Sequence, residues 1–180
     1  MSAFEICIVN VVATATLDRP VDLDFLAHLF PRFISYDSQR YFAAYFKSDK
    51  MQGKVSIFSS GKLISVGTRS AEKAQHELTL VASYLENAEI AKLKSPPKIR
   101  NIVATADLGF RPDLERIAIS RKTKVIYEPE QFPGAIIHLT LSEKSKATIL
   151  LFSSGKIVCV GLTDRKDINA AIHQLLHIIS

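Results

Sequence analysis

The chain contains the same pattern twice, and this repetition limits the folds available to it. Residues 10–17 read NVVATATL and residues 101–108 read NIVATADL, with six of the eight aligned positions identical. Residues 57–67 read IFSSGKLISVG and residues 151–161 read LFSSGKIVCVG, with seven of eleven identical. Two copies of domain size exclude a solenoid or a propeller and predict a pseudo-two-fold pair. We therefore expect function on a surface that both copies share.

The boundary between the copies is expected at a proline-rich segment. The sequence KLKSPPK at residues 92–98 contains paired prolines, which forbid a helix, and lysines, which keep it solvated. We place the first repeat at residues 1–91, the linker at 92–98 and the second repeat at 99–180.

Composition fits a compact intracellular protein without a catalytic centre. At 180 residues and 47% hydrophobic content the chain can bury a core, and it has neither a membrane-length apolar run nor a secretory signal. We expect it inside the cell, in the cytoplasm, or in the nucleus if the host is eukaryotic. Cys7 and Cys159 lie outside any zinc-type cluster and are expected to be buried small hydrophobes. The net charge of +5 favours a polyanionic partner only if geometry agrees.

Catalytic and metal motifs are missing from both repeats. We find no triad, carboxylate dyad or glycine-rich nucleotide loop, so we expect no enzyme and no cofactor. His173 and His177 lie four residues apart, but no HExxH glutamate accompanies them, so we expect no metal site.

The two repeats predict the same order of elements: a strand, a short helix, three β-like runs and a longer helix. Strands are expected at 8–17, 41–48, 54–58 and 62–66, and then at 135–141, 146–152 and 156–160. Short acidic helices are expected at 22–29 and from Asp113. Both FSSGK segments predict two-residue hairpins, because glycine accepts a positive φ. The closing helices have apolar stripes spaced by four, three and four: Ala74, Leu78, Val81 and Leu85, then Ile168, Ile172, Leu175 and Ile179.

Strand alternation predicts a sheet that is apolar on both faces. Val11, Ala13, Ala15 and Leu17 suit a face beneath helices, whereas Asn10, Val12 and Thr14 lie on the other. The same alternation adds two equivalent sets to this second face: Phe58, Ser60, Lys62, Ile64 and Val66, and Leu150, Phe152, Ser154, Lys156, Val158 and Val160. Two helices per repeat cannot cover both faces. The second face is then either an interaction surface or a core covered by the other repeat or a dimer partner. Its paired asparagines, phenylalanines and rim lysines favour the interaction surface.

These motifs resemble those of the TATA-box-binding protein family. The resemblance covers nearly the whole chain and includes both repeats, the FSSGK hairpins and YEPEQFPG at residues 127–134. It implies an α+β fold, in which two pseudo-symmetric repeats form one curved ten-stranded antiparallel saddle sheet with helices on the convex face. It also implies sequence-preferring binding of A·T-rich promoter DNA in the minor groove, DNA bending and nucleation of transcription initiation, for which this family is itself a standard example.

The resemblance also implies roles for individual residues. Asn10 and Asn101 would donate to base acceptors, which in the minor groove do not distinguish A·T from T·A. Phe132 and Phe152, with Tyr41 and Phe58, would act as wedges between base steps. The remaining expected DNA contacts are Val12, Thr14, Arg40, Phe42, Lys47, Ser60, Lys62, Ile64, Val66, Val103, Thr105, Pro133, Leu150, Ser154, Lys156, Val158 and Val160. Glu128, Glu130 and Gln131 match positions that dock a transcription factor B-type protein, and other initiation factors or regulators would contact the helical face.

Several positions depart from the family pattern. Val66 and Val160 stand where threonine is common, Ser56 replaces an apolar residue, and Tyr41 replaces a wedge phenylalanine. The alternative function is therefore a divergent paralogue with relaxed or lost DNA specificity that regulates initiation through protein contacts.

Overall fold

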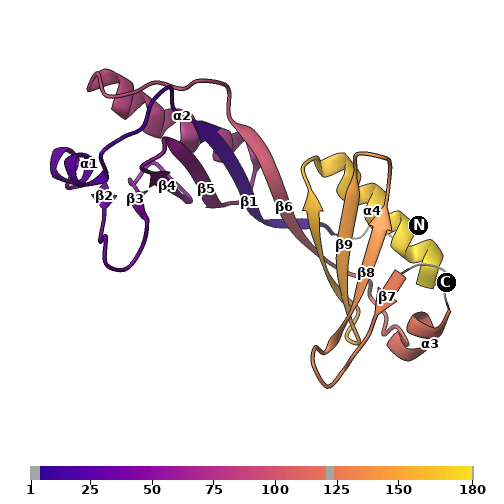
Figure 1. Ribbon diagram of the computed structural model, residues 1–180. Coiled ribbons are helices and arrows are strands. Elements are labelled where there is room, and N and C mark those ends of the chain that lie inside the picture. The colour runs from indigo at the N-terminus through magenta and orange to yellow at the C-terminus, as the bar shows by residue number, and fades with distance from the viewer. Residues whose placement is uncertain (1–4, 121–123, 180) are drawn as a thin grey trace. The chain divides into compact units, whose positions relative to one another are not determined.

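The computed structural model describes residues 5–120 and 124–179, which form two compact units (Figure 1). The N-terminal unit comprises residues 10–100, and the C-terminal unit comprises residues 101–179 together with residues 5–9 of the described chain. The compact units therefore differ from the sequence repeats at their ends, since residues 5–9 pack with the second repeat.

Each unit contains five strands and two helices in the same order. The N-terminal unit contains β1 (Cys7–Thr16, from Asn10 on), α1 (Leu23–Leu29), β2 (Ile34–Ser35), β3 (Ala43–Phe46), β4 (Lys54–Phe58), β5 (Lys62–Thr68) and α2 (Ala71–Asn87). The C-terminal unit contains β6 (Lys98–Asp107, from Asn101 on), α3 (Leu114–Ile119), β7 (Lys124–Ile126), β8 (Gly134–Thr140), β9 (Lys146–Phe152), β10 (Lys156–Leu162) and α4 (Arg165–Ile179). The strand orders are β2-β3-β4-β5-β1 and β7-β8-β9-β10-β6, and adjacent strands within each unit are antiparallel.

Side chains at the helix starts explain where three of the helices begin. Asp22 and Asp113 accept from the backbone N–H groups of Phe25 and Arg116, both at 3.0 Å, and so cap α1 and α3. Ser70 caps α2 in the same way at 3.1 Å. Each cap satisfies a donor that the first turn of a helix leaves unpaired.

The FSSGK hairpins contain three loop residues, so the two-residue prediction is wrong. The loops are residues 59–61 and 153–155, which end at Gly61 with φ +86° and Gly155 with φ +91°. A Cβ at these glycines would lie 2.6 Å from the carbonyl oxygen of Arg19 and 2.2 Å from that of Phe110. Each loop therefore needs glycine both for its conformation and for close contact with a neighbouring segment.

Helices cover one side of each sheet. α2 packs on β4 and β5, and α4 packs on β8 and β10 (Figure 1). All four residues of the predicted α2 stripe are fully buried, as are Ile168, Ile172 and Leu175 of the α4 stripe, whereas Ile179 is only half-buried. The predicted helices and their inward faces are thus confirmed except at the last residue.

Two local expectations need correction or refinement. Cys159 is buried, and burial raises the pKa of its thiol to about 11, but Cys7 is exposed, so the expectation that both are buried is wrong for Cys7. The proline-rich segment is not helical. Before its prolines, Leu93 forms an isolated bridge with Leu17 and the Lys94 N–H donates to the Thr16 carbonyl at 2.9 Å.

A buried carboxylate fixes the β3–β4 loop. Glu77 of α2 is 2% exposed, and its Oε1 accepts from the N–H groups of Gln52 at 2.7 Å and Gly53 at 2.9 Å. The ammonium of Lys47 holds the same loop from another direction, since it donates to the carbonyl oxygens of Met51, Gln52 and Gly53. The Glu77 bonds join the loop to α2, and the Lys47 bonds tie the end of the loop to its own first residue.

Replacing Glu77 with alanine should destabilise the protein. The change removes two charge-assisted hydrogen bonds and leaves two loop N–H groups unpaired, so we expect a loss of about 2 kcal/mol in the free energy of unfolding. Urea unfolding followed by circular dichroism measures this loss. Glu86→Ala, at an exposed position of the same helix, is the matched control, and an equal effect of both changes would contradict the role of Glu77.

Candidate nucleic-acid interface

The face opposite the helices is half-exposed in both units. In the N-terminal unit it carries Asn10, Val12, Thr14, Phe58, Ile64 and Val66, which we call the N half-face. In the C-terminal unit it carries Asn101, Val103, Thr105, Leu150, Phe152, Val158 and Val160, which we call the C half-face. Every one of these side chains is partly accessible, whereas their neighbours along the strands, such as Val11, Leu63 and Ile157, are buried. Strand alternation therefore placed these residues correctly.

The two asparagines are fixed in the same orientation. The Gly67 N–H donates to Asn10 Oδ1 and the Gly161 N–H donates to Asn101 Oδ1, both at 2.8 Å. Both glycines have φ near +90°, next to register irregularities in the β1–β5 and β6–β10 pairs. Because a backbone N–H requires an oxygen acceptor, each carboxamide must direct its NH₂ group elsewhere. Each half-face thus holds a preoriented double donor.

Aromatic side chains are arranged differently in the two units. Phe132 and Phe152 meet edge to face, with ring centroids 5.8 Å apart and an interplanar angle of 61°. In the N-terminal unit Tyr41 instead stacks on Tyr45, with centroids 5.3 Å apart and rings 12° from parallel. Phe42 is 85% exposed. The structure therefore brings together Phe132 and Phe152, the two expected wedges of the C-terminal unit. In the N-terminal unit, the expected wedge Tyr41 lies against Tyr45.

The expected rim cations have different surroundings. Lys62 and Lys156 are exposed at the first residues of β5 and β10. Arg40 is exposed, with Nε 3.3 Å from the Asp37 carboxylate. The ammonium of Lys47, by contrast, already donates to three carbonyl oxygens of its own loop, so its structural role competes with a phosphate contact.

One cation near the N half-face was missed by the sequence reasoning. The Nε of Arg100 donates to Thr14 Oγ1 at 2.8 Å. The equivalent residue of the first repeat is Val9, so the repeat comparison gave no reason to select Arg100. The mismatch between arginine and valine in otherwise similar strands was the available signal.

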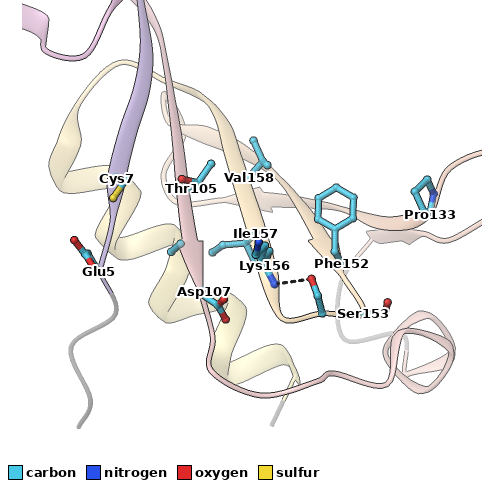
Figure 2. A pocket seen from close by; sticks show the side chains of 12 residues that line it. Glu5, Cys7, Thr105, Asp107, Pro133, Phe152, Ser153, Lys156, Ile157 and Val158 are labelled. Atoms are coloured by element: carbon cyan, nitrogen blue, oxygen red, sulfur yellow. Dashed lines mark hydrogen bonds between the residues drawn. The ribbon is translucent and has the colours of Figure 1, made fainter.

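A groove of about 780 Å³ lies along the end of the C half-face (Figure 2). Phe152, Val158 and Thr105 line it beside Lys156, and the residues labelled in Figure 2 include two carboxylates, Glu5 and Asp107. Lys156 and Asp107 are cross-strand partners in the β6–β10 pair. The sequence reasoning selected neither carboxylate, although Asp107 replaces Thr16 of the first repeat. This part of the surface combines an apolar floor with mixed charge.

The remaining candidate residues are exposed in loops or on helices. Ser60 and Ser154 lie in the hairpin loops, and Pro133 directly precedes β8. Glu128, Glu130 and Gln131 are exposed between β7 and β8, where the Gln131 and Phe132 N–H groups donate to the Glu128 carbonyl at 2.9 Å. His173 and His177 are exposed on α4, and within the described chain no three His, Cys, Asp or Glu side chains gather as metal ligands.

Comparison with known proteins identifies the fold and the family. The sequence matches the family described as "Transcription factor TFIID (or TATA-binding protein, TBP)" at residues 5–88 and 96–180. The chain belongs to the TATA-binding protein family. Membership agrees with the resemblance seen in the sequence, and this family consists of transcription factors, not of enzymes. None of the helices in the described residues is long and apolar enough to cross a membrane.

Individual TATA-binding proteins are similar over nearly the whole chain. The TATA-box-binding protein of Methanococcus aeolicus is 33% identical over 172 residues, covering 95% of this chain and 92% of that one. That of Saccharomyces cerevisiae is 33% identical over 171 residues, covering 95% and 70%. A solved structure, "Methanococcus jannaschii TBP", has a TM-score of 0.79 at 33% identity and covers 97% of this chain and 98% of its own. This likeness confirms the expected fold class.

Neutralising Asp107 should strengthen binding to duplex DNA. Asp107→Asn removes a negative charge beside Lys156, and asparagine can still accept from the Gly109 N–H, which lies 2.9 Å from Asp107 Oδ1. We expect about threefold tighter binding at low salt and a smaller gain at high salt, because the effect is electrostatic. Fluorescence anisotropy at several salt concentrations measures it. Glu115→Gln on α3 removes the same charge elsewhere, and an equal gain from that change would contradict a local effect.

Proposed function

We propose that the protein binds A·T-rich promoter DNA in the minor groove, bends it and nucleates assembly of the transcription initiation complex. The observation that carries this proposal is the pair of equivalent half-faces, each with an apolar floor and a fixed asparagine donor. Family membership and near-complete coverage by TATA-box-binding proteins support it. The similarity to known proteins gives no support to the alternative, a divergent paralogue with relaxed or lost DNA specificity that regulates initiation through protein contacts.

The residue types fit the chemistry of the minor groove. A·T pairs present only acceptors there, adenine N3 and thymine O2, whereas G·C pairs add the guanine amino group. The Asn10 and Asn101 amides supply donors, and an apolar floor such as the valine and leucine side chains of the C half-face leaves a guanine amino group without a partner. Phe132 and Phe152 can unstack a base step, at a cost of a few kcal/mol that the larger contact with bent DNA offsets. Lys62 and Lys156 would bind phosphates.

Anisotropy with duplexes of equal length tests the proposal. We expect an A·T-rich promoter duplex to bind more tightly than a random duplex at moderate salt, because its minor-groove acceptors match the two amides. Equal affinity for both duplexes across the salt range would overturn sequence-preferring binding.

Phe152 and Lys156 should contribute differently to the bound state. Phe152→Ala should reduce DNA bending, measured by energy transfer between dyes at the duplex ends, more than Lys156→Ala does. Lys156→Ala should instead reduce the salt dependence of binding by about one phosphate contact. Lys166→Ala, at an exposed position of α4, controls for the loss of charge. Equal changes in bending and in salt dependence from both substitutions would contradict this division of roles.

The partner proposal concerns the loop between β7 and β8. We expect Glu128, Glu130 and Gln131 to dock a transcription factor B-type protein, because all three are exposed and two carry negative charge. A protein with a basic surface complements this loop, and binding there leaves the apolar half-faces free for DNA.

A further inference from the structure

The two half-faces differ at one small residue beneath the aromatic side chains. In the C-terminal unit this residue is Gly134, which pairs with Phe152 across β8 and β9. A Cβ added to Gly134 would lie 2.9 Å from Phe132 Cε1 and 3.1 Å from Phe152 Cε1. The phenylalanine pair therefore depends on the missing methyl group.

The N-terminal unit has that methyl group. Ala43 occupies the equivalent position, pairs with Phe58 and is 1% exposed. Tyr41, the counterpart of Phe132, stacks on Tyr45. An edge-to-face pair of Tyr41 with Phe58 in the geometry of the other unit would meet this methyl group closely, and Tyr41 lies against Tyr45 instead.

Beside this position the N-terminal unit carries two hydroxyl side chains, Tyr45 and Ser56, which we add to the N half-face because they are in register with Ile64. Tyr45 pairs with Ser56, and Ser56 pairs with Ile64 on the next strand. The equivalent row of the C-terminal unit is Ile136, Leu150 and Val158, which is apolar throughout. Lys54 adds a cation 4.2 Å above the Tyr45 ring. In this row the N-terminal unit thus carries two hydroxyl groups, that of the half-buried Tyr45 and that of Ser56, which is 8% exposed, where the C-terminal unit carries only hydrocarbon.

The hydroxyl of Tyr45 remains protonated under ordinary conditions. Burial, together with the charge and hydrogen bond of the neighbouring Tyr41, raises the pKa of Tyr45. A neutral phenol and the serine hydroxyl both donate and accept hydrogen bonds. The Tyr45 and Ser56 hydroxyl groups can therefore accept a hydrogen bond from a donor that an apolar surface would leave unpaired.

In the minor groove that donor is the guanine amino group, the one feature that separates G·C from A·T pairs there. Next to Leu150 and Ile136, the guanine amino group would lose its hydrogen bond to water and would form no other, which is unfavourable. Against Ser56 and Tyr45 the bond can be replaced.

We propose that the N half-face accepts a G·C pair in its half of the DNA site, that the C half-face does not, and that this difference sets the direction in which the protein binds. The inference rests on the proposed minor-groove function and adds a specificity-determining pair, Tyr45 and Ser56. An asymmetric promoter with G·C on one side would then be bound in one orientation.

Three duplexes test this asymmetry in the wild-type protein by anisotropy. The first has a symmetric A·T-only core, the second has one G·C pair in one half, and the third has a G·C pair in both halves. The one-sided duplex should bind within about threefold of the A·T-only duplex, because the protein can turn its N half-face toward the G·C pair. The two-sided duplex should bind about tenfold more weakly, the cost of one mismatched pair.

Exchanging the side chains of the two equivalent rows, Tyr45 and Ser56 in one unit and Ile136 and Leu150 in the other, provides matched variants. Tyr45→Ile with Ser56→Leu should make the one-sided duplex about tenfold weaker, because neither half-face then accepts guanine. Ile136→Tyr with Leu150→Ser should restore binding to the two-sided duplex. Circular dichroism verifies that each variant is folded, and the affinity of each variant for the A·T-only duplex is the reference from which its own G·C penalties are calculated.

Orientation is read directly from DNA cleavage. In a Cys7→Ser background, Glu130→Cys carries an iron chelate on the exposed β7–β8 loop, while Cys159 stays buried and unlabelled. Cleavage should fall on the A·T side of the one-sided duplex and move to the other side when the G·C pair is moved. Absence of binding to the A·T-only duplex would overturn the proposed function itself. Normal A·T binding with cleavage on both sides, or with equal penalties for one and two G·C pairs, would overturn only the asymmetry.

Discussion

Helices cover only one side of the five strands in each unit, and the opposite side must therefore make its contacts with another molecule. α2 and α4 bury the alternate residues that face them, such as Leu63 and Ile157, completely. The valines, isoleucine and phenylalanines between those residues stay half-exposed on strands that are held rigidly from behind. Apolar surface of this kind on a well-packed scaffold marks a binding site. A shallow, continuous ligand surface such as a DNA groove matches it better than a small molecule does.

Duplication made the two half-faces alike, and substitution has made them different. The asparagine carboxamides accept from equivalent glycine N–H groups at the same distance in both units. Ala43 in place of Gly134, Ser56 in place of Leu150 and Arg100 in place of Val9 affect one copy only. A symmetric scaffold can thus hold a pair of surfaces with separate preferences, and each substitution can change one surface without disturbing the other.

Repetition and periodicity predicted most of the fold and placed most of the candidate site residues on one half-exposed face. The helix stripes, the meander strands and the alternation of Asn10, Val12 and Thr14 depend on local spacing, which the sequence records directly. β2 and β7 were missed by pattern because they have two and three residues, too few for a period to be seen. Contacts between distant residues were also out of reach. Lys47 bonds to its own loop, Glu77 is buried in a helix stripe, and Tyr41 is redirected near Ala43, and none of these follows from the types of adjacent residues.

Both hairpin loops are held tightly against neighbouring segments of the chain. In both units a loop glycine carbonyl accepts from the backbone beyond the first strand, from Leu17 at 2.8 Å and Leu108 at 2.9 Å. Neither Gly61 nor Gly155 leaves room for so much as a methyl group against the segment it touches. The tips that carry Lys62 and Lys156 are consequently stiff supports. In the proposed complex we therefore expect the nucleic acid, and not the hairpins, to change shape.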